Sequence, residues 1–371
     1  MKKQIFHLAL FSFILFYSGL TAAEPSDPFL FYRGAADASA AVALNESLFL
    51  VADDENNTLR LYSTQRPGLP LDAFDLTAFL AVDPEHPEAD LEGAAQTPDR
   101  IYWISSHGRN KDGKLRPSRY RFFATAYKLE NNRVAVTPLG RPCTTLIHSL
   151  VKSDLGRRLN LDRYTRLNDN LKKKDRKKLA PKNDGLNIEA LAAAPDGHTL
   201  YLGFRNPRPP GPDSRPAALV IPLLNPADVV EHARTPRFGE PLLWNLAGRT
   251  LRAMDYIPLQ RAYYIVAGPI DEETGFILYC WSGEADSPPA PLKNIFPDHP
   301  TFKPEALLVF PRESRLLLLS DDGALPVKVT SLAQCRPGEL SSDGFCPNKF
   351  LTDPARRTFR AAWLTPPHTD Y

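Results

Sequence analysis

The sequence predicts an all-β protein, and more specifically a β-propeller of five four-stranded blades. Proline occurs 36 times in 371 residues and, with glycine, divides the chain into short apolar runs. Many of these runs alternate and few have a helical period, which is typical of strands. A pair of neighbouring strands recurs along the chain, and such repetition indicates blades around an axis. A β-sandwich of hairpins is the alternative, but a sandwich needs no repeated inner-strand motif.

Each repeat starts with a strand of small or apolar residues, which turns within a few residues into a more strongly apolar strand. We expect these pairs at 37–44 and 47–54, 90–95 and 100–106, 187–192 and 199–205, 250–255 and 262–267, and 303–308 and 315–322. With the outer strands that follow, we expect blades near 37–82, 90–140, 187–246, 250–296 and 303–364. The last blade needs residues 358–364 as its third strand and residues 29–33 as its fourth. That pairing would join the two ends of the chain and remove open sheet edges.

Residues 1–23 have the layout of a secretory signal peptide. Lys2 and Lys3 precede an apolar run from Ile5 to Tyr17, and small residues lead to Ala23. The run is too short for a spanning helix, and no later stretch is apolar enough to span a membrane. We expect a mature chain of residues 24–371 that forms one propeller domain, is monomeric, and is periplasmic or secreted. Cleavage lowers the formal charge from +2 to about 0, which argues against a nucleic-acid partner.

The four cysteines fit an oxidising compartment. Cys335 and Cys346 flank a short segment rich in glycine and serine, and we expect a disulfide that staples this loop. Cys280 lies in an apolar run and is expected to be a buried, inert thiol. The pairing state of Cys143 stays open. The chain contains no CxxC pair, so a zinc–thiolate site is not expected.

Alignment of the five inner strands brings polar residues to one end of the predicted ring. One aligned position reads Ser39, Glu92, Glu189, Arg252 and Glu305, and the position two residues earlier reads Asp37, Asp90, Asn187, Thr250 and Lys303. Residues two apart on a strand share a face. The second strand of each pair runs back, so its polar end lies at the same mouth of the channel. These ends contribute Asp53, His107, Arg109, Arg205 and Asp321.

Carboxylates crowded around a narrow opening repel one another unless a cation is present. We predict that Glu92, Glu189 and Glu305 hold a metal ion, with Ca²⁺ the best match for oxygen ligands. A small ligand or substrate, with an anionic one among the options, would contact the surrounding polar residues, namely Asp37, Asp90, Arg109, Asn187, Arg205, Arg252, Lys303 and Asp321. The alternative is a salt-bridged plug that only ties the blades together.

Catalysis at the same mouth is a further option. Two carboxylates can act as acid and base, and a histidine titrates near neutral pH. We therefore name Glu189, Asp53 and His107 as candidate catalytic residues. A histidine at a strand end more commonly serves as a hydrogen-bonding residue of a loop. No Gly-x-Ser-x-Gly elbow occurs, so a serine nucleophile is not expected.

Residues 146–184, between the second and third blades, form a partly helical basic insertion. Residues 152–184 contain twelve Lys/Arg and five Asp, a net charge of +7. The insertion leaves the ring on the mouth side, where it could screen the acidic groups or recruit an anion. A solvated surface loop is the simpler interpretation.

Several short runs resemble the bacterial domain-of-unknown-function family 3616. These include Asp90-Leu-Glu-Gly-Ala94 and Gly185-Leu-Asn-Ile-Glu-Ala190, and the full set covers 33–42, 51–57, 90–94, 106–113, 185–190, 203–207, 304–306 and 320–323. The resemblance implies a repeat-built β protein without an established reaction. The same two runs more weakly resemble the exported phytase-like esterase propellers, which would imply phosphoester or ester hydrolysis at a metal-lined mouth.

Two functions from different classes follow from these observations. The first is a binding propeller whose mouth holds a small ligand or a divalent cation. The second is a metal-assisted hydrolase of phosphoesters or esters, in which the ion polarises the substrate or activates water.

Overall fold

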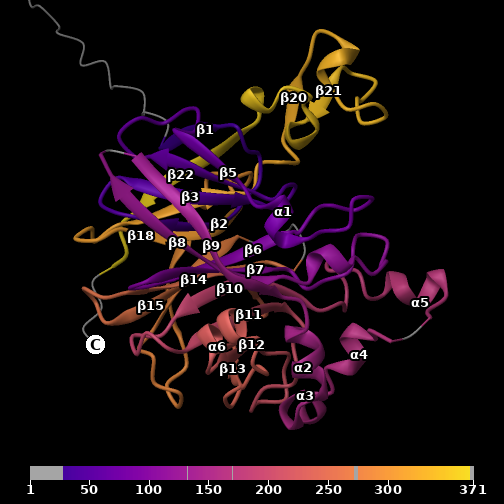
Figure 1. Ribbon diagram of the computed structural model, residues 1–371, viewed down its shortest axis with the longest axis vertical. Helices are drawn as coiled ribbons and strands as arrows, with labels where there is room; N and C mark the ends of the chain where they lie inside the picture. The colour runs from indigo at the N-terminus through magenta and orange to yellow at the C-terminus, as the bar shows by residue number, and fades with distance from the viewer. Residues whose placement is uncertain (1–27, 132, 169, 271–274, 368–371) are drawn as a thin grey trace, which may run out of the picture.

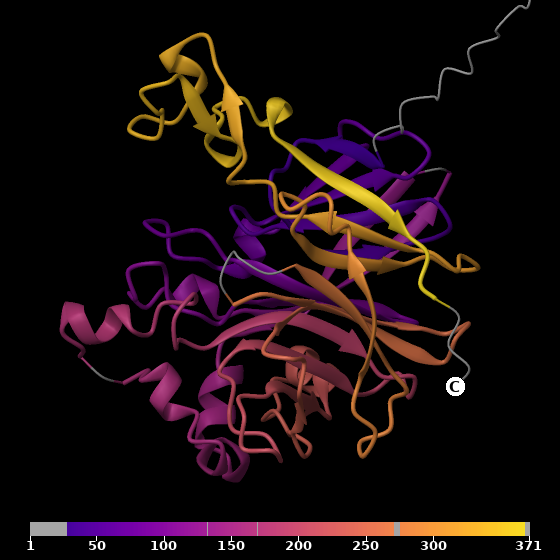
Figure 2. The ribbon, with the colours of Figure 1, turned by 180° about the vertical axis from the view of Figure 1, so that it is seen from behind.

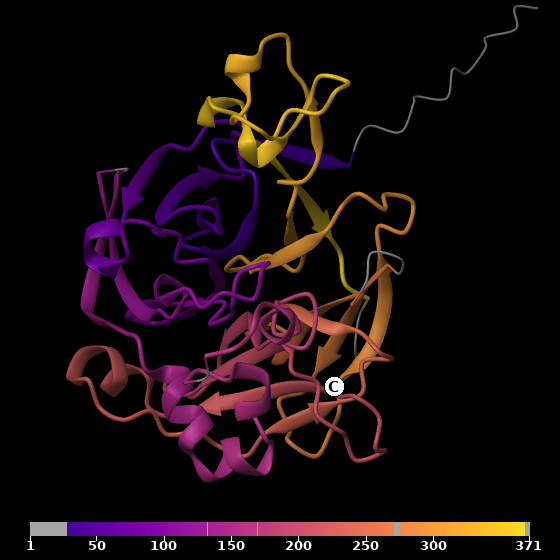
Figure 3. The same ribbon diagram turned by 90° about the vertical axis from the view of Figure 1, so that its right-hand side faces the viewer.

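The computed structural model describes residues 28–131, 133–168, 170–270 and 275–367, and its architecture is a five-bladed β-propeller (Figure 1). The predicted signal peptide, residues 1–23, lies outside the described residues. Five antiparallel sheets of four strands surround a common centre, as Figure 3 shows. Each innermost strand contacts the innermost strands of both neighbouring blades. The fold class predicted from the repeats is therefore confirmed.

Each blade is a meander that begins at the axis. Blade one contains β2 (Ala38–Ala43), β3 (Leu48–Asp53), β4 (Thr58–Ser63) and β5 (Asp72–Asp75). Blade two contains β6 (Leu91–Thr97), β7 (Arg100–Ser105), β8 (Phe122–Glu130) and β9 (Arg133–Cys143). Blade three contains β10 (Asn187–Ala193), β11 (Leu200–Asn206), β12 (Ala218–Leu223) and β13 (Leu242–Trp244). Blade four contains β14 (Thr250–Ile257), β15 (Ala262–Gly268), β16 (Phe276–Trp281) and β17 (Ala290–Ile295).

Blade five joins the two ends of the chain. It contains β18 (Pro304–Val309), β19 (Leu316–Ser320), β22 (Thr358–Leu364) and β1 (Phe29–Arg33), in that order from the axis. Strand β1 pairs with β22 along its whole length, and Tyr32 stacks on Phe359 at 5.2 Å between ring centroids. The predicted closure by terminal strands is confirmed, and it leaves β22 paired on both sides.

The hydrophobic core lies between the blades rather than in one central mass. Apolar side chains from adjacent sheets pack face to face, for example Trp103 and Phe123 of blade two in one cluster with Leu50 of blade one. The inner strands carry small residues such as Ala190, because five strands converge on the axis and leave little room there. Cys280 is buried in β16, and neither Cys280 nor Cys143 forms a disulfide.

The insertion between blades two and three is helical and basic, as expected. It contains α2 (Leu146–Lys152), α3 (Asp154–Arg158), α4 (Asp162–Thr165) and α5 (Lys173–Lys177). Leu146, Ile147 and Leu150 pack into the cluster between blades two and three, whereas α5 buries no residue. Two other short helices, α1 (Thr77–Leu80) and α6 (Pro226–His232), cover the outside of the ring.

A second insertion interrupts blade five and forms a small module, here called the stapled module (residues 326–351). It contains β20 (Pro326–Lys328) and β21 (Phe345–Pro347), and the predicted Cys335–Cys346 disulfide joins its halves. Figure 2 shows it projecting from the ring beside blades one and five. The sequence predicted the disulfide but not this separate two-stranded sheet. No helix among the described residues has the length and hydrophobicity needed to cross a membrane.

Candidate functional site

A β-bulge at the same place in all five inner strands aims the central side chains at the channel. The pairing with the second strand skips one residue in each blade, namely Ser39, Glu92, Glu189, Arg252 and Glu305. A bulged residue is released from the ladder, and its side chain is re-aimed. These are the five residues that the sequence alignment placed at the centre. The structure brings Glu92, Glu189 and Glu305 together around one narrow cavity, and Arg252 bridges two of them.

Blades three to five neutralise their charges with arginine. Arg252 donates to Glu189 at 2.8 Å and to Glu305 at 3.1 Å, and Arg205 donates to Glu189 at 2.7 Å. Asn187 donates to the same Glu189 carboxylate at 2.8 Å. Burial alone would raise the pKa of Glu189, but Arg205 and Arg252 more than offset this effect and lower it. This part of the centre therefore matches the salt-bridged plug.

The cavity on the axis is small. Its volume is about 20 Å³, and its walls include Glu92, Glu189 and Glu305 with alanines of the inner strands. A cavity needs roughly 10–15 Å³ to hold one water molecule. The channel at this level therefore has room for a water or a single ion, and an organic ligand would have to bind outside it.

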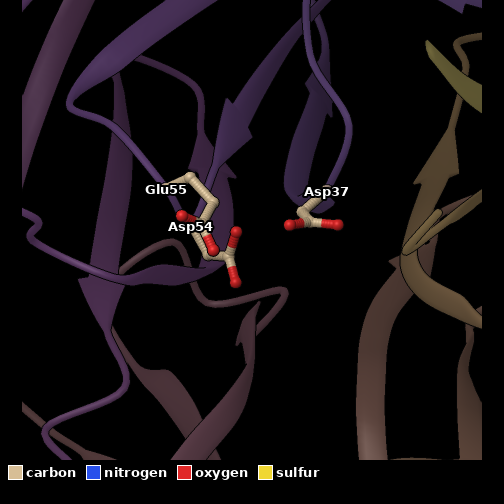
Figure 4. A group of neighbouring side chains, drawn as sticks. All are labelled: Asp37, Asp54 and Glu55. Atoms are coloured by element: carbon tan, nitrogen blue, oxygen red, sulfur yellow. The ribbon is translucent and has the colours of Figure 1, made fainter. Parts of the chain in front are cut away.

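Blades one and two carry a second group of carboxylates, here called the acidic cluster (Asp37, Asp54, Glu55, Asp90 and Glu92). Ligand oxygens of Asp37, Asp54 and Glu55 lie within 4.8 Å of one another, and so do those of Asp54, Asp90 and Glu92. Figure 4 shows the first three side chains, with Asp37 entering from β2 and the other two from the end of β3. Arg119 contacts Asp90 at 2.9 Å and also pairs with Glu88. Asp54 is shared by both groups and so connects the two blades.

Asp37 is the most constrained member of the acidic cluster. It is 2% exposed, and neither of its carboxylate oxygens has a hydrogen-bond donor among the described residues. Its closest cation is the Lys349 ammonium, at 3.7 Å. A Cβ atom on Gly323 would lie 1.9 Å from Asp37 Oδ1, so the chain approaches Asp37 in a way that only glycine allows. The loop after β19 thus presses its backbone against this carboxylate.

Burial and like charges weaken the acids of this cluster. Burial raises the pKa of Asp37 well above its usual value, and Asp54 and Asp321 add to the effect. Burial and Glu92 likewise raise the pKa of Asp54. The pKa of Glu92 is also raised well above normal, first by burial and then by Asp90. In blade five, burial and Asp321 raise the pKa of Glu305 to about 8 although Arg252 opposes them. Each of these shifts indicates a carboxylate with too little positive charge nearby.

The proton on the Asp37–Asp321 pair has a defined place. The two residues form an isolated antiparallel bridge, and their carboxyl groups interact directly. Burial alone would raise the pKa of Asp321. A hydrogen bond from Asp37, the Gly323 amide and two lysines more than offset burial and lower it. Asp37 is therefore the protonated partner and Asp321 the ionised one when no other cation is present. Lys303 is one of the two lysines near Asp321.

Asp53, a candidate catalytic residue, is bonded within its own turn. Its carboxylate accepts from the Glu55 amide at 2.9 Å and the Ala36 amide at 3.4 Å. Asp53 is also paired with Ala38 in the ladder between β2 and β3. The neighbouring Asp54, which the candidate set omits, is the residue that joins the acidic cluster.

His107 and Arg109 lie beside the basic insertion. His107 is buried, its Nδ1 lies 2.9 Å from the Ser105 carbonyl oxygen, and its ring contacts Tyr120 edge-on. Burial lowers the pKa of His107 to about 4, so the ring is neutral at pH 7. Arg109 donates to the carbonyl oxygens of Thr165 and Arg166 in the insertion. Neither side chain forms a hydrogen bond or ion pair with the acidic cluster among the described contacts.

Sequence reasoning missed three residues of the acidic mouth. Asp54 and Glu55 follow directly after Asp53, and the alternation of a strand gave no way to choose among them. Lys349 contacts Glu55 at 2.6 Å although it is 294 positions away and belongs to the stapled module. A search for acidic residues that follow the second strand would have found Asp54 and Glu55. No local signal identifies Lys349.

Comparison with solved structures finds many propeller-like matches of low identity. One is a putative oxidoreductase (glucose dehydrogenase) from Thermus thermophilus, with 13% identity, 90% of this chain and 98% of that chain covered, and a TM-score of 0.42. Another is a protein of unknown function from Bacteroides thetaiotaomicron, with 10% identity, coverage of 91% and 76%, and a TM-score of 0.36. A third is the Swd1 β-propeller domain from Myceliophthora thermophila, with 8% identity, coverage of 79% and 96%, and a TM-score of 0.33. Similarities of this size carry no information about activity.

No curated protein matches the sequence, and the resemblance to phytase-like esterases finds no support in these comparisons. A family model does match, over residues 37–223, which include the first three blades up to β12 and the basic insertion. Its description is a protein of unknown function, DUF3616. The match contains both acidic inner-strand runs that carried the resemblance, around Glu92 and Glu189. This chain therefore belongs to the DUF3616 family.

Proposed function

We propose that the acidic cluster at the channel mouth binds a hard divalent cation, with Ca²⁺ as the best match. Its members offer only carboxylate oxygens, which are the ligands that calcium prefers. Asp37, Asp54 and Glu55 come from one side of the mouth, and Asp90 and Glu92 from the other. A cation between them would contact two blades at once.

The observation that carries this proposal is the set of buried carboxylate oxygens without donors. Both oxygens of Asp37 and Oδ1 of Asp54 are buried and receive no hydrogen bond from the described residues. Buried polar groups are nearly always paired, because leaving one unpaired costs free energy. A divalent cation would satisfy these oxygens and remove the repulsion that raises the pKa values of both residues.

The geometry favours an ion over an organic ligand. The cavity on the axis has room for about one water molecule. Arg109, Arg205 and Arg252, the cations that would recognise an anionic ligand, already contact protein groups. In this proposal Glu189 and Glu305 belong to the arginine-bridged half, and of the three predicted metal ligands only Glu92 takes part. The Cys335–Cys346 disulfide supports an oxidising compartment, either periplasmic or extracellular, as the place where this function operates.

Calorimetric titration of the metal-stripped protein with CaCl₂ tests the proposal. We expect one calcium per chain, and we expect Asp54→Asn to lose at least tenfold in affinity because Asp54 belongs to both carboxylate groups. Glu189→Gln is the matched control, since it removes a central carboxylate that two arginines already neutralise. Calcium affinity of Asp54→Asn equal to that of the unmodified protein would contradict the proposed site.

A metal-assisted hydrolase of phosphoesters or esters is the second candidate, and one observation favours it. The raised pKa of Glu92 keeps a carboxylic acid protonated beside the proposed ion, as a general acid requires. A panel of phosphoesters and esters, assayed with calcium and with chelator, tests this function. Turnover that needs calcium and is lost in Glu92→Gln but kept in Glu189→Gln would support the hydrolase. Silence across the panel would leave cation binding as the function.

A further inference from the structure

The ammonium group of Lys349 lies at the acidic cluster. Its Nζ is 2.6 Å from Glu55 Oε1 and 3.7 Å from Asp37 Oδ2, and its side chain is 29% exposed. Burial alone would lower the pKa of Lys349, but Asp37, Asp54 and Glu55 more than offset burial and raise it. The group therefore remains charged and supplies positive charge to the carboxylates that lack hydrogen-bond donors.

The stapled module holds Lys349 in this place. Lys349 lies three residues after Cys346 of the disulfide, and its backbone amide donates to the Gly323 carbonyl oxygen at 3.1 Å. The preceding Asn348 is buried and donates to the carbonyl oxygens of Asp322 and Thr358, at 3.1 and 2.6 Å. These contacts join the module to both strands of blade five that flank it. The position of the lysine is thus linked to that of the whole module.

We propose that Lys349 is a tethered counter-cation, which occupies the acidic cluster until a divalent cation displaces it. The inference rests on the proposed function, because it concerns the same carboxylates. Calcium binding and the docking of Lys349 then exclude each other. Calcium binding at the mouth is thereby coupled to the freedom of the segment that follows Cys346.

Distances explain why both cations do not fit. Calcium binds carboxylate oxygens at about 2.3–2.6 Å, and the Lys349 ammonium is 2.6 Å from Glu55 Oε1. If both contacted this carboxylate, two cations would lie only a few ångströms apart in a partly buried site, where repulsion is weakly screened. Asp37 adds to the competition, because it faces the ammonium and belongs to the same ligand group.

The first test compares the calcium affinity of three proteins by calorimetry at pH 7.5 after removal of metal. We expect Lys349→Met to bind calcium at least tenfold more tightly than the unmodified protein. Lys328→Met is the matched control, because Lys328 belongs to the same module and lies over the Phe345 ring at 4.7 Å. Its affinity should remain within twofold of the unmodified protein.

The second test uses the unmodified protein, so it does not depend on the folding of a variant. Brief acetylation of lysines in calcium or in chelator, followed by peptide mass spectrometry, reports how free each ammonium is. We expect calcium to raise the modification of Lys349 at least threefold and to leave Lys328 unchanged. Asp54→Asn should abolish the calcium effect on Lys349.

The outcomes separate this inference from the function on which it rests. If the unmodified protein and Lys349→Met both fail to bind calcium, the proposed function is wrong and the inference is wrong with it. If both bind calcium with equal affinity, or if acetylation of Lys349 is insensitive to calcium, the cation site stands and the tethered counter-cation is refuted.

Discussion

Replacing Arg252 with methionine should destabilise the propeller, because this arginine joins the inner strands of three blades. Its guanidinium donates to Glu189 at 2.8 Å, to Glu305 at 3.1 Å and to the Pro269 carbonyl oxygen at 3.0 Å. Removal of one partner from a buried ion pair costs about 3–5 kcal/mol. Because Glu189 keeps Arg205 at 2.7 Å, we expect a loss at the lower end, about 3 kcal/mol.

Urea unfolding at pH 7.5, followed by tryptophan fluorescence, measures this loss. Arg215→Met is the control, since Arg215 is exposed and its carboxylate partner is 3.9 Å away; its cost should stay below about 0.5 kcal/mol. The double variant Arg252→Met/Glu305→Gln should cost less than the sum of the two single changes, because it removes the carboxylate that loses its partner. The reasoning fails if Arg252→Met unfolds within about 0.5 kcal/mol of the unmodified protein.

Three further predictions follow from other parts of the fold. His107 has a pKa of about 4 in the folded protein, so only the unfolded chain takes up a proton as the pH falls from about 6.5 towards 4. Stability should therefore decrease over that window by up to about 3 kcal/mol, and urea unfolding of His107→Phe at pH 4.5 and 7 should show less of this decrease. Replacing Cys335 and Cys346 with serine removes a constraint of about 3 kcal/mol for a loop of this length; hydrogen exchange should accelerate in the stapled module, and equal acceleration in the blades would contradict a local role. Deleting residues 28–33 leaves β22 as an open edge, which should lower Tm and cause aggregation detectable by light scattering, whereas an unchanged monomer would argue against ring closure as a source of stability.

Local periodicity was sufficient to predict the blades. A strand of small residues followed by an apolar strand recurs because every blade meets the same environment, crowded at the axis and apolar between sheets. The third and fourth strands of blade five followed from counting, since a ring with four complete blades needs the ends of the chain to complete the fifth. The Cys335–Cys346 disulfide followed from a short spacing. None of these features depends on contacts that only the folded chain creates.

The composition of the mouth was only partly predictable. The alignment placed Glu92, Glu189, Arg252 and Glu305 together, but it could not divide them into an arginine-bridged half and an acidic half. That division depends on which side chains meet across blades, such as Arg205 with Glu189. It also depends on turns, since Asp53 accepts backbone amides while Asp54 joins the cluster.

The sequence by itself determined a five-bladed ring closed by its terminal strands, with a set of charged residues on the inner strands, because a repeating pattern of burial is written into each blade. Only the tertiary structure decided which carboxylates are neutralised, and by which cation. The bulge in each inner strand re-aims one side chain, and the stapled module brings Lys349 to Glu55 from 294 positions away. Electrostatic pairing depends on distance in space, and no local pattern in the chain encodes it.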